Sequence, residues 1–400
     1  MRDETRAGGN GAGAGALVGI GAADLEATLQ PLERATMLPP AAFTEPAVLG
    51  WELANIFSQG WVCAGHASMV AEPGAFIRRE IGAESVVVIG GEDGAVRAFH
   101  NVCRHRGARI VEDEEGQVRR RLRCPYHAWS YDLEGNLQAA PHMDEVEDFD
   151  YSCYGLRPVR AAVLGGLVFV DVGGEADPIE EHVGELLGHL ERYSNASLRR
   201  AGAHTYEVAA NWKGIAENYN ECLHCPGVHP ELNALSDYMS GEGIYGAGAW
   251  CGGSMTLNEG AETMGKEGGH SLRPPIATLE AADMPNILYF ALFPNALVSL
   301  HPDYAMLHTL WPREPGRTFV TCEFFFEPST IAEPGFDPGD AIRFWDQTNR
   351  QDWHVCEITQ QGVASSGYSA GRYSAEESDV HAFDAMVAAR YREGLREVVA

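Results

Sequence analysis

Cys103-Arg-His-Arg-Gly107, followed by Cys124-Pro-Tyr-His-Ala-Trp129, is the stretch that decides the fold. Its spacing is Cys-x-His, eighteen residues, then Cys-x-x-His. Each half offers one thiolate and one imidazole on a turn that we expect to follow a strand. Such ligands suit a structural zinc site or an iron–sulfur centre held by two cysteines and two histidines. Four buried residues without a metal is the third interpretation, and two matching turns disfavour it.

Short strand patterns surround this stretch. They alternate with turn signals such as Glu72-Pro-Gly74 and Gly90–Gly94. A helix is expected over residues 46–58, and the strands are expected at residues 61–64, 76–79, 85–89 and 95–99. We therefore predict an N-terminal all-β domain over residues 45–160. The glycine-rich opening predicts a disordered or extended segment over residues 1–44.

A second motif spans residues 211–230, Asn211-Trp-Lys-Gly-Ile-Ala-Glu-Asn-Tyr-Asn-Glu-Cys-Leu-His-Cys-Pro-Gly-Val-His-Pro230. Its apolar spacing predicts a helix with Glu221 and His224 on one face. Pro226 and Gly227 would end that helix and turn His229 back toward His224. Two such imidazoles can bind a transition metal, and one added carboxylate would complete the ligand set of non-haem Fe(II) oxygenases. Two histidines five residues apart are weak evidence by themselves.

The rest of the chain predicts a second domain over residues 161–400, so the fold class is α+β. An amphipathic helix over 178–194, a strand from 206 and a long, mobile, glycine-rich loop over 241–269 are expected. Four strand patterns over 287–326 predict an antiparallel sheet, and a helix should follow over 338–362. Asp352 lies on the apolar stripe of that last helix. A buried carboxylate needs a partner, and a salt bridge or a solvated position is the alternative.

Composition excludes several classes of partner. The formal net charge of −28 and pI near 4.8 argue against nucleic acid or an anionic membrane and mildly favour a cationic ligand. Nine scattered cysteines behind no secretory segment favour reduced thiols and a cytoplasmic location. No apolar run is long enough to predict a transmembrane helix.

The wording of the two Cys/His turns closely resembles the Rieske domain of ring-hydroxylating and N-demethylating oxygenases. The resemblance covers roughly residues 45–390 and includes the whole 211–230 motif. It implies a [2Fe–2S] cluster with Cys103 and Cys124 on one iron and His105 and His127 on the other. It also implies a helix-grip (Bet v1-like) catalytic domain with mononuclear Fe(II) held by His224, His229 and Asp352.

Glu221 departs from the commoner pattern, in which an aspartate bridges a cluster histidine of the neighbouring subunit to an iron ligand. Glutamate at this position is similar to the branch that oxidises glycine betaine, carnitine, proline betaine and choline. A quaternary ammonium group forms no hydrogen bonds, so its pocket should use aromatic faces. The candidates are Tyr219, Trp250, Tyr289, Phe290 and Tyr304, each of which could instead be an ordinary core residue.

The resemblance therefore implies hydroxylation of an N-methyl group of a glycine betaine-like compound by O2, with formaldehyde release. It also implies a homotrimer and a separate NAD(P)H-dependent flavin or iron–sulfur reductase. Choline, carnitine, or an aromatic or O-methyl compound remain alternative substrates. A non-catalytic iron–sulfur or zinc protein is the alternative from another class. Arg273 and Arg372 are candidates for binding a substrate carboxylate, although a solvated position suits each.

Overall fold

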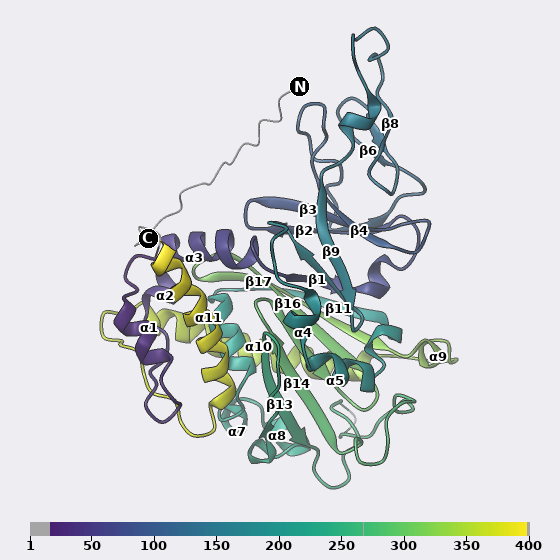
Figure 1. Cartoon of the computed structure of the whole chain (residues 1–400). Coiled ribbons are helices and arrows are strands. Elements are labelled where there is room, and N and C mark those ends of the chain that lie inside the picture. The colour runs from purple at the N-terminus through teal and green to yellow at the C-terminus, as the bar shows by residue number, and fades with distance from the viewer. Residues whose placement is uncertain (1–16, 267, 398–400) are drawn as a thin grey trace.

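The computed structural model describes residues 17–266 and 268–397, so the prediction of disorder for residues 1–16 lies outside the described chain. Two seven-stranded antiparallel sheets organise the molecule (Figure 1), and helices pack mainly on the second. The α+β class with an N-terminal β domain and a C-terminal helix-and-sheet domain is confirmed. No helix in these residues is both long and apolar enough to span a bilayer.

The segment before residue 45 is partly helical, so the prediction of a disordered or extended segment over 1–44 is wrong for its described part. The helices before residue 45 are α1 (Ala22–Thr28) and α2 (Ala41–Thr44). The helix predicted over 46–58 follows as α3 (Pro46–Glu52), which a π-helical turn over Leu53–Phe57 extends. They pack beside the C-terminal helix α11 (Ser378–Glu397) and the body of the protein (Figure 1), and their apolar side chains, such as Leu25 and Val48, are buried. Trp51, for example, meets Tyr391 of α11 edge to face at 5.7 Å. This tertiary burial stabilises helices that are too short to form alone.

The first sheet carries the two Cys/His turns above it. Its strand order is β1-β10-β9-β4-β3-β2-β5, and a small sheet β6-β7-β8 forms the tip (Figure 1). The strands are β1 (Val62–His66), β2 (Ala75–Ile81), β3 (Glu84–Gly90), β4 (Val96–His100), β5 (Glu115–Gln117), β6 (Leu122–Arg123), β7 (Ser130–Tyr131), β8 (Leu137–Ala139), β9 (Pro158–Leu164) and β10 (Leu167–Asp171).

Strand β10 lies within the second domain predicted over residues 161–400, but it pairs with β1 and β9 of the first sheet. The first sheet therefore continues to Asp171, beyond the boundary at residue 160. We propose a domain boundary near residue 172.

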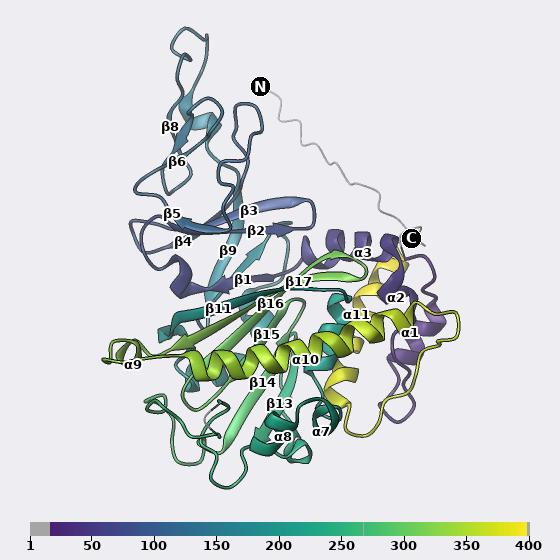
Figure 2. The same ribbon diagram turned by 180° about the vertical axis from the view of Figure 1, so that it is seen from behind.

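The second sheet holds the predicted run of four strands. Its order is β11-β17-β16-β15-β14-β13-β12, and every pairing is antiparallel. The strands are β11 (Arg199–Val208), β12 (Glu242–Gly243), β13 (Trp250–Thr256), β14 (Asn286–Leu292), β15 (Ala296–Leu300), β16 (Ala305–Glu314) and β17 (Arg317–Phe326). The long helix α10 (Gly339–Val363) lies across one face of this sheet (Figure 2), as in a helix-grip fold, and a short helix α9 (Pro328–Ile331) precedes it.

Two predictions fail at glycines. The helix expected over 178–194 is divided into α4 (Ile179–Val183) and α5 (Leu186–Arg192), because Gly184 has φ +53° and a side chain there would collide with the carbonyl of Ala247. The expected mobile loop over 241–269 contains strand β13. Gly252 lets β13 approach β14 closely, since a Cβ atom would lie 2.0 Å from the carbonyl oxygen of Tyr289. Glycine lowers strand propensity, which hides such a strand from pattern reading.

Candidate active site

The two Cys/His turns at the tip of the first domain have the same backbone geometry. The N–H of Gly107 donates to the carbonyl of Cys103 at 3.0 Å, and the N–H of Ala128 donates to that of Cys124 at 3.2 Å. Gly107 and Ala128 both have positive φ, at +76° and +61°. The two thiols are buried, and burial raises the pKa of Cys103.

The two imidazoles of these turns lie side by side nearer the surface. The ring centroids of His105 and His127 are 4.6 Å apart, and His105 stacks on Trp129 at 4.8 Å. Two buried sulfurs and two adjacent imidazoles on paired turns form the donor set that a [2Fe–2S] centre with mixed ligands needs. The residues present therefore fit such a cluster.

The 211–230 motif folds differently from the continuous helix that its periodicity predicts. Helix α6 covers only Trp212–Tyr219. It begins where the Asn211 side chain accepts the N–H of Lys213, and it ends where the Asn220 amide donates to the carbonyl of Ala216. Glu221 and His224 therefore lie in a turn, not on a helix face.

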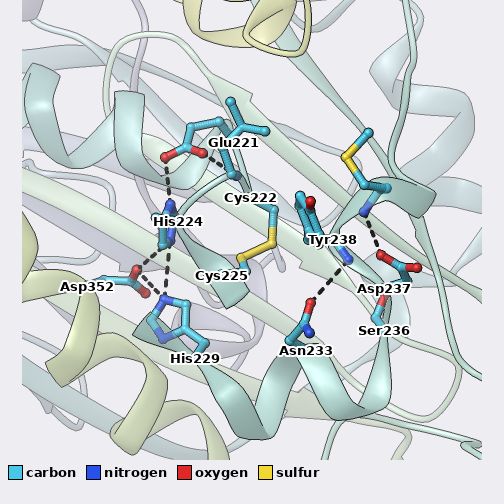
Figure 3. Close-up of a disulfide and its surroundings, with 12 residues drawn as sticks. Glu221, Cys222, His224, Cys225, His229, Asn233, Ser236, Asp237, Tyr238 and Asp352 are labelled. Atoms are coloured by element: carbon cyan, nitrogen blue, oxygen red, sulfur yellow. Dashed lines mark hydrogen bonds and ion pairs between the residues drawn. A yellow bond between two sulfur atoms is a disulfide. The ribbon is translucent and has the colours of Figure 1, made fainter. Parts of the chain in front are cut away.

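Pro226 also has a different role from the predicted one. It lies in the first turn of α7 (Cys225–Val228), a position where proline is well tolerated. Helix α8 (Pro230–Leu235) begins immediately after His229. One short helical turn thus separates His224 from His229 and places both imidazoles on the same side (Figure 3).

Three ligand atoms converge at this place. The Nε2 atoms of His224 and His229 lie 3.2 Å apart, and Asp352 Oδ1 on α10 lies 3.2 Å from the first and 2.7 Å from the second (Figure 3). The prediction that His229 turns back toward His224 agrees with this arrangement, and α10 brings Asp352 to both. Among the described residues this is the cluster with the spacing of a metal site.

The other side of each imidazole is held by an acceptor. His224 Nδ1 lies 2.6 Å from Glu221 Oε1, and His229 Nδ1 lies 2.8 Å from Gln351 Oε1. An acceptor at Nδ1 fixes the proton there and leaves the Nε2 lone pair free for a metal. This hydrogen bonding, together with the two-histidine, one-carboxylate donor set, fits mononuclear iron.

The electrostatics of the site favour positive charge. Burial opposes a charged His224, but Asp352 and Glu221 outweigh it and raise its pKa to about 9. Burial also opposes ionisation of Asp352, yet the two histidines lower its pKa. Both shifts show that a cation among these groups is stabilised.

Cys222 and Cys225, which flank His224, form a disulfide (Figure 3). This corrects the expectation that every cysteine is reduced; the other seven cysteines are free. Spacing of three residues across the turn into α7 brings the two sulfurs together. The disulfide therefore closes the loop that carries His224.

A cavity of about 750 Å3 of empty space, partly open to solvent, adjoins the three ligands. Tyr219 and Tyr289, two of the five aromatic residues predicted for the substrate pocket, line it with ring centroids 6.3 Å apart. Sequence reasoning missed further lining residues, the most prominent of which are Trp345, Trp353, His308 and Asn349.

Three predicted pocket residues do not line this cavity. Phe290 follows Tyr289 on β14 and so points to the opposite face of the sheet, where Trp250 packs on it at 5.4 Å. Tyr304 is fully buried behind the wall. Its hydroxyl donates to the Met264 carbonyl and accepts from Trp345 Nε1, both at 2.7 Å, so it supports two lining residues without reaching the cavity.

A β domain with a cluster site and a helix-grip domain with a two-histidine, one-carboxylate site together define a two-centre redox enzyme. The model of the Rieske [2Fe-2S] domain matches residues 60–150, and that of the ring hydroxylating alpha subunit (catalytic domain) matches residues 195–393.

Individual relatives cover nearly the whole chain. The glycine betaine monooxygenase oxygenase subunit of Pseudomonas aeruginosa is 29% identical over 86% of both chains. The carnitine monooxygenase oxygenase subunit of Escherichia coli is 30% identical over 86% of this chain and 89% of its own. The crystal structure of the quaternary ammonium Rieske monooxygenase CntA with L-carnitine superposes with a TM-score of 0.75 at 26% identity, covering 89% of this chain and 96% of that one.

The chain belongs to the Rieske oxygenase alpha subunits, in the branch of monooxygenases that act on quaternary ammonium compounds. Its cofactors are accordingly a Rieske [2Fe–2S] cluster and mononuclear iron.

Proposed function

We propose that this chain is an oxygenase component that hydroxylates an N-methyl carbon of a quaternary ammonium compound. The observation that carries the proposal is the cavity beside His224, His229 and Asp352, whose wall contains two tyrosine and two tryptophan side chains. The wall runs from Tyr289 through Tyr219 and His308 to Trp353, with successive ring centroids 6.2–6.4 Å apart, and Trp345 also lines it. Aromatic faces attract an ammonium group that has no N–H to donate.

The reaction consumes O2, two electrons and two protons. One oxygen atom enters a C–H bond of the N-methyl group and the other leaves as water. The resulting N-hydroxymethyl group loses its O–H proton, and its C–N bond breaks with the electron pair staying on nitrogen. The products are formaldehyde and a tertiary amine.

The two metal centres have different roles in this reaction. Iron held by His224, His229 and Asp352 would supply oxygen activation, and a cluster held by the two Cys/His turns would supply electrons one at a time. We assign Cys103 and Cys124 to one iron of the cluster and His105 and His127 to the other. His224, His229 and Asp352 would hold the mononuclear iron, while Tyr219, Tyr289, Trp345 and Trp353 hold the substrate's cationic end against it.

A homotrimer is part of this proposal. The tip that holds the cluster turns and the helices α7 and α8 lie at opposite ends of the molecule (Figures 1 and 2). Glu221 lies beside the iron site with its side chain 16% exposed, so a neighbouring subunit's cluster histidine could reach it. An NAD(P)H-dependent reductase would deliver the electrons, since the relatives are themselves oxygenase subunits.

Spectroscopy and product analysis test the function together. We expect a coloured protein with the electron paramagnetic resonance signal of a reduced Rieske cluster, and iron in excess of the cluster. With a reductase, NADH and an N-methylated substrate, formaldehyde should form in step with NADH consumption. A colourless protein that holds zinc and no sulfide would contradict the proposal.

A further inference from the structure

The charged side chains that line the active-site cavity set which end of a substrate it can hold. No lysine or arginine of the described chain is among its lining residues, whereas the carboxylates of Glu221 and Asp352 are. The formal net charge of −28 adds a field of the same sign. A cation is therefore stabilised in this cavity, and a carboxylate finds no lysine or arginine there to pair with.

The two arginines that the sequence suggested for a substrate carboxylate are used elsewhere. Arg273 is buried and forms ion pairs with Asp303 at 2.9 Å and Asp340 at 2.5 Å. Arg372 donates to the backbone carbonyl of Glu33, close to the isolated bridge that its backbone forms with Thr36. Neither residue lines the cavity.

Several neutral donors of the wall are also engaged within the protein. The hydroxyl groups of Tyr219 and Ser299 bond to each other at 2.7 Å. Thr348 donates to the carbonyl of Phe344 at 3.2 Å, and Trp345 Nε1 donates to Tyr304. Trp353 Nε1 has no partner among the described residues, but one neutral N–H would replace only a small part of the hydrogen bonds that a carboxylate makes with water.

His308, which lines the cavity, is held by a chain of hydrogen bonds. Tyr206 donates its hydroxyl proton to Asp346 at 2.9 Å, so its oxygen accepts from Asn349 Nδ2 at 3.4 Å. This orients Asn349 Oδ1 toward His308 Nε2, at 3.3 Å, and places the ring proton on Nε2. Burial lowers the pKa of His308 to about 4, so the ring stays neutral.

The remaining nitrogen of His308, Nδ1, is therefore a bare acceptor without a hydrogen-bond partner among the described residues. An acceptor repels a carboxylate, but it accepts a proton from a hydroxyl group.

We propose that the substrate is a quaternary ammonium cation whose remaining arm carries no acid group. This rests on the proposed function and departs from the glycine betaine-like substrate expected from the sequence. Compounds with an uncharged arm, including a hydroxyalkyl arm, should be oxidised, and betaines that end in a carboxylate should be rejected.

Three compounds that differ mainly at the end of the arm test this proposal: choline, propyltrimethylammonium and glycine betaine. Each is supplied to the holoenzyme with reductase and NADH, and kcat/KM is measured from substrate loss and formaldehyde. Both uncharged-arm compounds should exceed glycine betaine by at least about 100-fold, because a carboxylate enters the cavity unpaired. Equal or faster oxidation of glycine betaine than of either one would overturn the proposal.

Binding to the resting holoenzyme, measured by calorimetry without reductase, should follow the same order. The two proposals fail differently. If none of these compounds nor L-carnitine binds or is oxidised, the proposed function itself is wrong. If glycine betaine or L-carnitine is preferred, the function stands and the inference about the arm falls.

A charge added to the wall should reverse the selectivity. Met255 lines the cavity from β13, opposite Ile287 of β14. Met255→Arg should raise the ratio of kcat/KM for glycine betaine over propyltrimethylammonium by at least about 10-fold, through a charge-assisted pair with the carboxylate. Met255→Gln, of similar length and uncharged, is the matched control and should leave the ratio within about 3-fold. An unchanged ratio in a Met255→Arg protein that retains both metals would count against the proposal.

Discussion

The hydrogen bond between Glu221 and His224 offers the sharpest test of the iron site. Glu221 Oε1 lies 2.6 Å from His224 Nδ1, and its second oxygen accepts the backbone N–H of Leu223 at 2.5 Å. Glu221→Gln keeps the length of the side chain but removes its charge. A glutamine has only one acceptor oxygen, so it cannot satisfy both of these donors.

The expected loss can be worked out from these two contacts. A hydrogen bond to a charged group contributes about 1.5–3 kcal/mol and a neutral one about 0.5–1.5 kcal/mol. The difference of about 1–2 kcal/mol corresponds to a 5- to 30-fold weaker iron site. Because the amide also faces an unsatisfied N–H at Leu223, we expect the upper half of this range. Turnover should fall further if Glu221 also receives the neighbouring subunit's cluster histidine.

The assay separates these effects. Iron affinity is measured by equilibrium with a chelator, the cluster by its visible absorption, and turnover at saturating iron by formaldehyde release. The cluster should be unchanged in Glu221→Gln. The control is Glu242→Gln, which removes an exposed acid on β12. An iron affinity within 2-fold of wild type would refute the reasoning on His224, and full turnover with restored iron would refute the bridging role.

Three more variants test the surroundings of the site. His229→Ala should lose the mononuclear iron but keep the coloured cluster; loss of the cluster instead, seen by visible absorption, would mean that the two sites are wrongly assigned. Cys222→Ser combined with Cys225→Ser should lower the melting temperature, because the closed loop restrains the unfolded chain by about 2 kcal/mol; alkylation of denatured wild type should label only the seven free cysteines. Burial raises the pKa of Asp384 to about 6, so the folded protein binds this proton more tightly than the unfolded chain and loses stability as pH rises from about 4 to 6. Asp384→Asn should flatten that part of the curve of unfolding free energy against pH, by up to about 1.4 kcal/mol per pH unit.

The sheets were largely predictable from the sequence, since their strands are apolar runs separated by turn residues. The run over 287–326 became β14 to β17 with boundaries shifted by a few residues. Strand β13 was not predicted because Gly252 and Gly253 add no apolar side chain to its pattern. They are glycines because neighbouring backbones approach closely at these two positions. The interruption of the predicted helix at Gly184 could not be predicted either, because it depends on a tertiary contact with the carbonyl of Ala247.

The metal ligands were accessible from spacing and resemblance, whereas the cavity wall was not. Tyr289 and Phe290 are adjacent aromatic residues that the sequence cannot distinguish, and only the register of β14 decides which one faces the cavity. Placing His308 in the cavity wall likewise requires knowing which face of the sheet the residues of β16 point to. The disulfide was missed because cysteine counting considers the chain as a whole, whereas Cys222 and Cys225 meet through one local turn.

Helix α10 shows what could have been found earlier. Trp345, Thr348 and Asn349, and Asp352 recur at the three- and four-residue spacing of one helical face, and all of them line the cavity. Once Asp352 is placed at the iron, helical geometry alone directs Trp345, two turns earlier, toward the same cavity. The register of α10 therefore sets the carboxylate ligand and the aromatic wall together, so a rotation of this helix would disturb iron binding and substrate selection at once.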